Sequence, residues 1–503
     1  MLLRRRALSV LVTAVLASAA CSSPAPDVVA RAAVAPSPTA TPKGPGTTAG
    51  ATSTTTVADP TVVDPAGVGD ALYPELGNGG YDVSHYDLAL SPDAASGELT
   101  GTATIDATAM AGRLAAFHLD LAGLTVDSVR VDGAPATWAR ADAELIVRPA
   151  APVAAGASFR VVVGYHGVPG DGSIPTSNLP LGWIRTAGGS YAINEPDGAR
   201  TWFPANDHPS DKATFTFHIS VADGTVAVAN GTLESEQSDG GRTTWTWTSD
   251  EPMATYLAVV AVGDYAFEDD TGPHGLPLRH AYLRADAATV VPCLATTTPI
   301  IDFFEAQFGP YPFATAGLLV ADSSPGLAME TQTRPIFSSL DFRDGCPQQL
   351  IAHELAHQWF GDAVSPARWQ DIWLNEGFAT YAEWLWGSGG DPATMNQLAQ
   401  GARADLVAAQ GQLPPIGRAT EDQLFGWQVY EGGAAVLQAL RLVVGDVTFF
   451  AILRQWVATH DGSSVTTEDF IATASAVAGR DLAPFLDAWL FGPDVPALPV
   501  SGH

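Results

Sequence analysis

Near residue 285 the hydrophobic periodicity of the chain changes from two residues to the helical period of about 3.6 residues. Before that point, short runs alternate apolar and polar side chains, which predicts strands, and turn residues such as Asp132-Gly133 separate them. These runs are residues 102–105, 117–121, 126–131, 159–165, 215–221, 225–229 and 245–247. Helical spacing follows in residues 300–308, 350–363, 372–386 and 434–443. We therefore expect a multidomain α and β protein, with an N-terminal antiparallel β domain over residues 71–270 and an α-rich domain over residues 271–495.

Composition sets limits on the class of protein. Of 503 residues, 46 % are hydrophobic, which is enough to bury a sizeable core and excludes global disorder. The 24 basic and 54 acidic residues give a net charge of −30, which would repel a phosphate backbone, so we expect no nucleic-acid partner. Three cysteines cannot build a disulfide scaffold. We expect Cys293 and Cys346 either to pair after export or to stay as buried thiols.

The first 21 residues have the pattern of an export signal. Arg4-Arg5-Arg6 precedes an apolar run from residue 7 to residue 20 and then Cys21. Residues 17–21 are similar to a lipoprotein cleavage box, so we expect Cys21 to carry a lipid anchor on the outer face of the cell membrane; the alternative is plain secretion. Residues 22–70 are rich in Ala, Pro, Ser and Thr, which predicts a disordered linker.

A metal-binding pattern lies in the second half of the chain. In His353-Glu354-Leu355-Ala356-His357, the two histidines are four residues apart and share one face of a helix, so both imidazoles can reach one metal ion. Glu376 follows after 18 residues on a second amphipathic segment and can complete a site of two histidines and one glutamate. This donor set suits a single Zn²⁺ ion with one open position for water, and it leaves Glu354 beside the metal for proton transfer.

Two more carboxylates flank this second helix. Asp371 is expected to be its N-cap. Glu383 lies seven residues after Glu376 on the same helix face, where it either accepts a hydrogen bond from a ligand imidazole or is a solvated surface charge.

These motifs resemble the gluzincin aminopeptidases of the aminopeptidase N family of zinc metallopeptidases. Besides the zinc pattern, four segments match the family in the right order: residues 81–88, 195–213, 252–257 and 309–312. The resemblance implies that the α-rich part is a thermolysin-like α/β zinc peptidase domain that holds one Zn²⁺ per chain. It also implies a zinc-dependent aminopeptidase that acts on peptides with a free N-terminus.

The resemblance further implies roles for individual residues. Glu354 would act as general base and then general acid. Tyr430, within residues 429–434, is similar to the tyrosine that stabilises the tetrahedral intermediate; the alternative is a core tyrosine at the start of a helix. Ala328, Met329 and Glu330 match the exopeptidase motif of the family, and Glu195 matches a second carboxylate for the substrate α-ammonium, although Glu195 could also be a surface loop charge.

Two positions depart from the family pattern, and the similarity stops near residue 490. Thr331 stands where the family usually has Asn, and Ile193 where many members have Gln. Residues 485–490 are similar to the end of the catalytic domain, so we expect a short exported bacterial member that lacks the C-terminal domains and has an open groove. The competing hypotheses are a zinc endopeptidase and a non-catalytic surface lipoprotein that binds ligands through a peptidase fold.

Overall fold

The computed structural model describes residues 67–110, 112–173, 180–323 and 327–499, which all belong to one structural unit. The predicted export signal, Cys21 and residues 22–66 of the predicted linker lie outside the described residues. Residues 67–70 of that linker lie in the folded part, and Asp70 is buried. Its carboxylate accepts hydrogen bonds from the backbone N–H groups of Leu72 (2.7 Å) and Trp369 (2.8 Å), so the chain enters the folded part slightly before the predicted residue 71.

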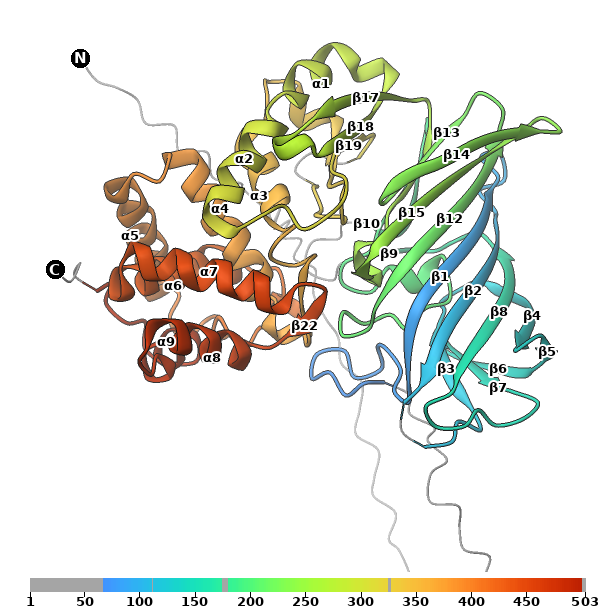
Figure 1. Cartoon of the computed structure of the whole chain (residues 1–503), viewed down its shortest axis with the longest axis horizontal. Coiled ribbons are helices and arrows are strands. Elements are labelled where there is room, and N and C mark those ends of the chain that lie inside the picture. Colours follow the sequence, from blue (N-terminus) through green and yellow to red (C-terminus); the bar gives the residue numbers. More distant parts are fainter. Residues whose placement is uncertain (1–66, 111, 174–179, 324–326, 500–503) are drawn as a thin grey trace, which may run out of the picture. The chain divides into compact units, whose positions relative to one another are not determined.

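An eight-stranded sheet dominates the N-terminal part (Figure 1). In sheet order its strands are β14 (Thr232–Asp239), β15 (Arg242–Ala254), β12 (Lys212–Ala222), β1 (Tyr81–Pro92), β2 (Leu99–Ala109), β8 (Ser158–Gly167), β4 (Thr125–Val131) and β5 (Ala134–Pro135). Alternate residues of β2 are buried, as the sequence pattern predicts for a strand with one face on a core. All neighbours pair antiparallel except β1 and β12, which run parallel.

Two smaller sheets complete this part. One has the order β13 (Val226–Ala229), β16 (Val260–Gly263), β11 (Gly189–Ile193), β10 (Pro180–Thr186) and β9 (Asp171–Ser173). The other has the order β3 (Phe117–Asp120), β7 (Glu144–Arg148) and β6 (Thr137–Ala141). Aromatic rings fill the space next to the large sheet, with Tyr86 stacked on Phe215 at 4.8 Å between ring centroids and Phe203 edge-on to Tyr86 at 5.8 Å.

The second part begins with a mixed sheet and continues with helices. The sheet has the order β17 (Tyr265–Thr271), β18 (Pro277–Leu283), β19 (Leu319–Ala321) and β20 (Ile336–Ser338). The predicted boundary between the two domains at residue 270 falls inside β17, which starts at residue 265. The exact position of that domain boundary therefore stays a prediction. The helices are α1 (Ala287–Leu294), α2 (Thr297–Phe308), α3 (Gln348–Ala356), α4 (Trp373–Ser388), α5 (Pro392–Ala408), α6 (Trp427–Val444), α7 (Asp446–His460), α8 (Thr467–Ala478) and α9 (Ala483–Leu490).

Two local predictions about these helices are wrong. The helix expected over residues 350–363 ends at Ala356, because the chain turns and the backbone N–H of Asp362 bonds back to the carbonyl of His357 (3.0 Å). The apolar residues of that turn are buried, which gave it the appearance of a helix face. Asp371 does not cap α4: its carboxylate accepts hydrogen bonds from Arg368 Nε and from the Thr467 hydroxyl, both at 2.7 Å.

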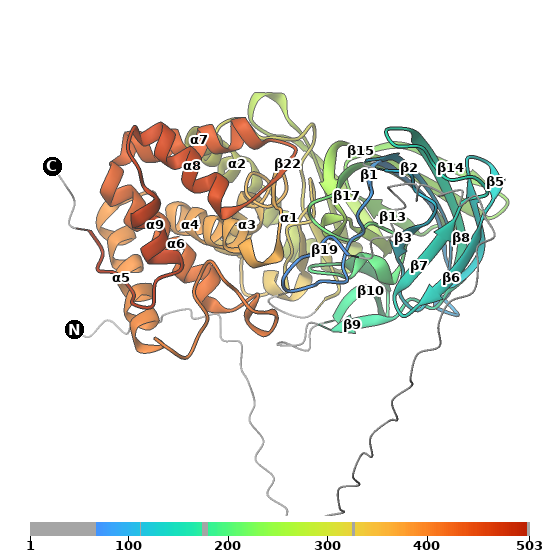
Figure 2. The ribbon, with the colours of Figure 1, turned by 90° about the horizontal axis from the view of Figure 1, so that it is seen from below.

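Helices α4 and α6 cross at a pair of glycines. A Cβ atom added to Gly377 would lie 2.8 Å from the Cα of Gly433, and one added to Gly433 would lie 2.7 Å from the Cα of Gly377. Glu376 precedes the first glycine and Tyr430 lies one turn before the second, so this close approach brings these two side chains to the same region. Figure 2 shows α4 and α6 side by side.

Replacing Gly433 with Ala is expected to force α4 and α6 apart. Overpacking of this kind costs about 1–3 kcal/mol of stability, and a shift of about 1 Å in a catalytic group lowers kcat by up to about 100-fold. Thermal unfolding and steady-state kinetics measure both effects. Gly401→Ala in α5 is the matched control, because nothing lies within 4 Å of the added Cβ. This variant should lower neither the stability nor kcat. Wild-type kinetics in the Gly433 variant would contradict the proposed importance of this crossing.

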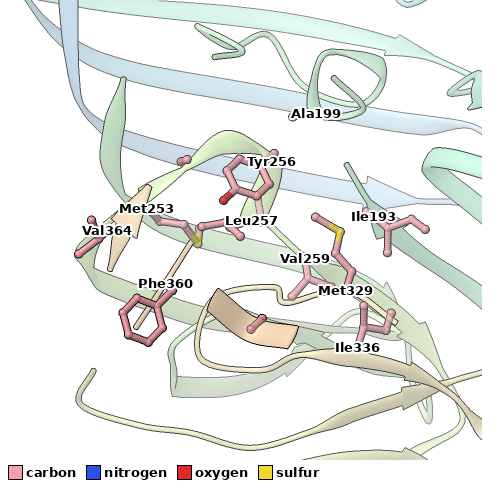
Figure 3. Close-up of a cluster of buried hydrophobic side chains, with 14 of the residues drawn as sticks. Ile193, Ala199, Met253, Tyr256, Leu257, Val259, Met329, Ile336, Phe360 and Val364 are labelled. Carbon is pink, nitrogen blue, oxygen red and sulfur yellow. The ribbon is translucent and has the colours of Figure 1, made fainter. Parts of the chain in front are cut away.

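A hydrophobic cluster joins the two parts (Figure 3). Ile193, Met253, Leu257 and Val259 contribute from the N-terminal part, and Met329, Ile336, Phe360 and Val364 contribute from the second part. All eight side chains are buried. The segment that carries Glu330 is therefore packed on the same core as the turn that follows the metal-binding motif.

The two cysteines whose state the sequence left open form a disulfide. It links Cys293 in α1 with Cys346, which lies just before α3. In the chain-entropy model, closing a loop of 53 residues contributes roughly 4 kcal/mol of stability. The bond therefore braces the start of the helix that carries the metal-binding histidines.

Within the described part of the chain, no single helix is both long enough and apolar enough to cross a membrane. Residues 284–294 and 297–308 together reach that length and composition, but they are bent by 43° at their junction. Ile300, Ile301 and Phe304 of the second segment are fully buried in the protein core.

Candidate metal centre

The predicted metal ligands converge from two helices. His353 and His357 lie one turn apart at the end of α3, and their Nε2 atoms are 3.2 Å apart. Helix α4 brings the Glu376 carboxylate to both rings: its Oε2 atom lies 3.3 Å from His353 Nε2 and 3.5 Å from His357 Nε2. All three side chains are buried.

This arrangement fits a small divalent cation. Ligands about 2.0–2.1 Å from a tetrahedral Zn²⁺ ion are separated from one another by about 3.4 Å. The three separations between these ligand atoms, 3.2, 3.3 and 3.5 Å, bracket that value. Two imidazoles and one carboxylate are also the donor set of catalytic zinc sites with an open fourth position. The residues present therefore match the ion that the sequence predicts.

Neighbouring groups orient both imidazoles. The Nδ1 atom of His357 lies 3.0 Å from the backbone carbonyl oxygen of Phe360, so Nδ1–H donates a hydrogen bond there and the Nε2 lone pair faces the metal site. The Nδ1 atom of His353 lies 3.5 Å from Glu383 Oε2. Glu383 thus stands next to a ligand imidazole, in the position that the first of its two sequence interpretations predicts.

The charged groups of the predicted metal site shift one another's pKa values. Burial favours the neutral form of Glu376, but the two histidinium rings outweigh it and hold the pKa of Glu376 at about 2. Burial also favours neutral histidines, yet the surrounding carboxylates raise the pKa of His353 and His357. A metal ion binds the neutral imidazole, so metal binding must displace any proton that these histidines hold at Nε2.

Glu354 lies beside the three predicted metal ligands and is predicted to transfer a proton rather than to bind the metal. It follows His353 in α3 and is turned about 100° away from it around the helix. One of its carboxylate oxygens, a nitrogen of His357 and an oxygen of Glu330 all lie within 4.8 Å of one another. Burial raises the pKa of Glu354 to about 8, and a divalent cation next to it would oppose that shift. A carboxylate in this environment is suited to accept and return a proton.

Glu195 and Glu330 come together from the two parts of the molecule. Oxygen atoms of Glu195, Glu330 and Glu376 lie within 4.8 Å of one another. Burial, reinforced by the charge of Glu330, raises the pKa of Glu195 well above its usual value, and burial also raises the pKa of Glu330. The Oε1 atoms of Glu195 and Glu330 are buried without a hydrogen-bond partner. Two buried carboxylates with unpaired oxygens next to a metal site are suited to bind a cation.

The other residues of the exopeptidase motif have different surroundings. The backbone N–H and C=O groups of Met329 both pair with Ile336, at 3.0 and 2.9 Å, and its side chain lies in the hydrophobic cluster of Figure 3. Ala328 is partly buried. The predicted contacts of Ala328 and Met329 with substrate stay predictions. Thr331, which replaces the usual Asn, donates a 2.6 Å hydrogen bond to the carbonyl oxygen of Arg334 and so closes a turn.

Tyr430 packs against a metal ligand. At the start of α6, its ring lies nearly parallel to the His353 ring, with 6.0 Å between centroids and 16° between planes. Burial, reinforced by the charge of Glu376, raises its pKa well above the usual value, so the hydroxyl keeps its proton. The side chain is only partly buried, unlike that of a core tyrosine.

Replacing Tyr430 with Phe is expected to lower kcat about 10²- to 10³-fold with little change in KM, because a donor to the oxyanion acts in the transition state. Steady-state kinetics on an aminoacyl-amide reporter measure this change. The control is Tyr381→Phe, which removes a buried hydroxyl that donates to Gln438 (3.0 Å) outside the metal site. Equal kinetic constants in the two variants would contradict the role of the Tyr430 hydroxyl.

Sequence reasoning missed two buried polar residues next to the motif. Gln358 directly follows His357 and is fully buried, and Asp362 lies in the same turn. Lys212 of β12 donates hydrogen bonds to the backbone carbonyl oxygens of Asp362 (2.7 Å) and Ala363 (3.0 Å), which ties the N-terminal part to this turn. In the sequence, Gln358 and Asp362 are marked only as polar residues among mostly apolar neighbours. No characteristic spacing relates them to the metal-binding motif.

Comparisons with protein-family models agree with this geometry. Residues 293–489 match the Peptidase family M1 domain, and residues 185–257 match the Peptidase M1 N-terminal domain. The first match contains the metal ligands and Tyr430, and the second contains Glu195.

Curated relatives match over part of their length. The chain is 26 % identical to Aminopeptidase M1 of Arabidopsis thaliana over 444 residues, which cover 80 % of this chain and 49 % of the relative. It is 28 % identical to Glutamyl aminopeptidase of Bitis rhinoceros over 332 residues, which cover 61 % of this chain and 34 % of the relative. The chain thus spans about half of the first relative and about a third of the second.

Solved structures match over their whole length. A mutant M1 zinc metallopeptidase from Deinococcus radiodurans, bound to a Tyr-Ser-Ala substrate, is 32 % identical with a TM-score of 0.80, and the match covers 87 % of this chain and 100 % of that one. A two-domain M1 zinc metallopeptidase mutant bound to L-arginine is 33 % identical with a TM-score of 0.79 and the same coverage.

Proposed function

Because this chain belongs to peptidase family M1, we propose that it is a zinc-dependent aminopeptidase that releases N-terminal residues from peptides with a free N-terminus. The observation that carries the proposal is the pair of buried, unpaired carboxylate oxygens of Glu195 and Glu330 next to the three metal ligands. A hydrolytic metal site does not by itself require them. A substrate α-ammonium could pair with both.

The metal ligands would be His353, His357 and Glu376. When bound there, Zn²⁺ would act as a Lewis acid that polarises the scissile carbonyl group and makes water a better nucleophile. The side chain of Glu383 and the carbonyl oxygen of Phe360 hold the two imidazoles in the orientation that this requires.

Glu354 would move the proton. Its carboxylate accepts a proton from the attacking water and then donates it to the amine of the departing peptide. Tyr430 donates a hydrogen bond from its hydroxyl to the negatively charged oxygen of the tetrahedral intermediate. Its high pKa keeps this donor protonated at neutral pH.

Glu195 and Glu330 would bind the α-ammonium of the substrate. Each carboxylate raises the cost of ionising the other, and a cation between them removes that cost. An N-acylated peptide brings no charge and leaves both carboxylates unpaired, so it should bind poorly. This argues against an endopeptidase, in which the chain would continue through the space between Glu195 and Glu330. The complete set of metal ligands with Glu354 and Tyr430 argues against a non-catalytic binding protein.

The test compares an aminoacyl-amide reporter with its N-acetylated form. We expect the free amine to be cleaved at least about 100-fold more efficiently. Glu330→Gln should lower this ratio mainly through KM for the free amine, because a neutral amide attracts the ammonium less. The control is Glu236→Gln, an exposed residue of β14. Equal cleavage of both reporters by the wild-type protein would contradict aminopeptidase activity.

Residues 1–21 are proposed to direct export, with Cys21 as the lipid attachment site; both lie outside the described residues. Fatty-acid labelling of cells that express the wild-type chain and Cys21→Ala tests this proposal. Label in the wild type alone is the expected result, and label in neither would favour plain secretion.

A further inference from the structure

Gln358 uses its full hydrogen-bonding capacity inside the protein. Its Nε2 group donates to the backbone carbonyl oxygen of Glu330 (3.0 Å) and to Asp362 Oδ2 (2.7 Å). Its Oε1 atom accepts from the backbone N–H of Thr333 (2.7 Å) and from the Tyr311 hydroxyl (3.2 Å). A glutamine amide has two donor hydrogens and two acceptor lone pairs, so all four are used. Two of the four bonds hold the segment that carries Glu330.

The same segment contains a backbone kink at Thr333. This residue has a φ of +67°, in the left-handed region that a β-branched residue rarely adopts. Two of its polar groups oppose relaxation of the kink: its N–H donates to Gln358, and its hydroxyl oxygen accepts from the backbone N–H of Gly231 (2.8 Å). The kink reverses the chain between Glu330, which faces the metal site, and Arg334, which is fully buried.

The turn between β13 and β14 holds the segment from the other side. Asn230 donates through Nδ2 to the carbonyl oxygen of Gln332 (2.9 Å). Arg334 donates to the carbonyl oxygens of Gly231 (3.3 Å) and Arg279 (3.2 Å), and its guanidinium lies over the Trp247 ring at 4.9 Å from the centroid. The backbone of residues 330–334 is thus fixed from both parts of the molecule.

The surroundings of the Glu330 carboxylate, by contrast, disfavour its charged form. This carboxylate is buried, its Oε1 atom has no hydrogen-bond partner, and oxygen atoms of Glu195, Glu330 and Glu376 lie within 4.8 Å of one another. In the absence of substrate, repulsion between ionised carboxylates favours movement of Glu330 away from Glu195 and Glu376. The other side of the carboxylate accepts a hydrogen bond from the backbone N–H of Glu330 itself, so the side chain follows the position of the backbone of its segment.

We propose that Gln358 is the positioning residue that holds Glu330 opposite Glu195 and thereby determines the preference for a free N-terminus. This inference rests on the proposed aminopeptidase function and deepens it. Gln358 directly follows the ligand His357, so it couples the position of Glu330 to the metal-binding motif itself. The folded protein thus already holds the two repelling carboxylates in place, so binding of the substrate does not have to bring them together.

Gln358→Met tests the proposal, because methionine has a similar length and cannot make any of the four bonds. The ratio of kcat/KM for the free aminoacyl-amide to kcat/KM for its N-acetylated form is expected to fall at least tenfold, through a higher KM for the free amine. The zinc content should stay at the wild-type value. Gln438→Met is the matched control: Gln438 is a buried glutamine of α6 that bonds Asn396 (2.8 Å) and Tyr381 (3.0 Å) outside the site.

A purely structural role for Gln358 predicts that both variants lose stability and keep the wild-type ratio, which would overturn the proposal. Tyr311→Phe removes one of the four bonds and should fold even where Gln358→Met does not. Its ratio is expected to fall about threefold, and a wild-type ratio in this variant also counts against the proposal. Failure of the proposed function is distinct, because the wild-type protein itself would then show no preference for the free amine.

Discussion

Replacing Glu354 with Gln is expected to lower kcat about 10³- to 10⁴-fold, because the amide has the same shape but cannot accept a proton from water. Glu354 is not among the three converging metal-ligand atoms, so the variant should keep the zinc content of the wild type. Burial of this side chain suits it to act as a base: a carboxylate with a pKa raised to about 8 takes a proton from water more readily than an exposed one. Steady-state kinetics and elemental analysis measure the two expectations.

Glu236→Gln, an exposed residue of β14, makes the same chemical change outside the site and should have wild-type kinetics. A Glu354 variant that retained more than about one tenth of the wild-type kcat would contradict its role as general base. A variant that lost its zinc would instead point to Glu354 as a structural part of the metal site.

Replacing Glu376 with Ala is expected to abolish both zinc binding and hydrolysis. This carboxylate is the only negatively charged ligand in the predicted set, and its Oε2 atom lies 3.5 Å or less from both ligand imidazoles. Without it, two histidines and a partly protonated environment offer a cation little affinity. Elemental analysis after dialysis should give close to zero zinc for the variant and close to one zinc per chain for the wild type.

Adding excess zinc to the Glu376 variant should restore only a small part of the activity, whereas wild-type protein stripped with a chelator should recover fully. Glu468→Ala is the control, because Glu468 is an exposed carboxylate of α8 that pairs with Arg368 (2.7 Å). Stoichiometric zinc in the Glu376 variant would show that the metal site is not the one described.

The sequence was most informative where function depends on local spacing. Two histidines four residues apart in a helix must share a face, so His353 and His357 could be paired without a structure. Glu376 followed from the next amphipathic segment, because a short connection returns the chain to the same region. Glu195 lies 158 residues before His353 (353 − 195), and no spacing rule relates them. Only the resemblance to a family placed this carboxylate near the metal.

The features that sequence reasoning missed depend on tertiary contacts. The apolar residues after Ala356 are buried by a turn rather than by a helix, and a burial pattern alone does not distinguish the two. The parallel pairing of β1 with β12 joins strands more than 120 residues apart, which alternation cannot reveal. The four bonds of Gln358 join the motif to Tyr311, Glu330, Thr333 and Asp362, and their value becomes visible only when these partners come together.

Mass spectrometry of the products formed from one unmodified decapeptide and from its N-acetylated form, with and without a chelator, tests the proposed activity most directly. A zinc aminopeptidase should produce a ladder of peptides shortened one residue at a time from the N-terminus. We also expect no cleavage of the acetylated peptide and no products when zinc is removed. Internal fragments from both peptides, or a ladder that persists in the stripped protein, would contradict a zinc aminopeptidase built on Glu195, Glu330 and the three metal ligands.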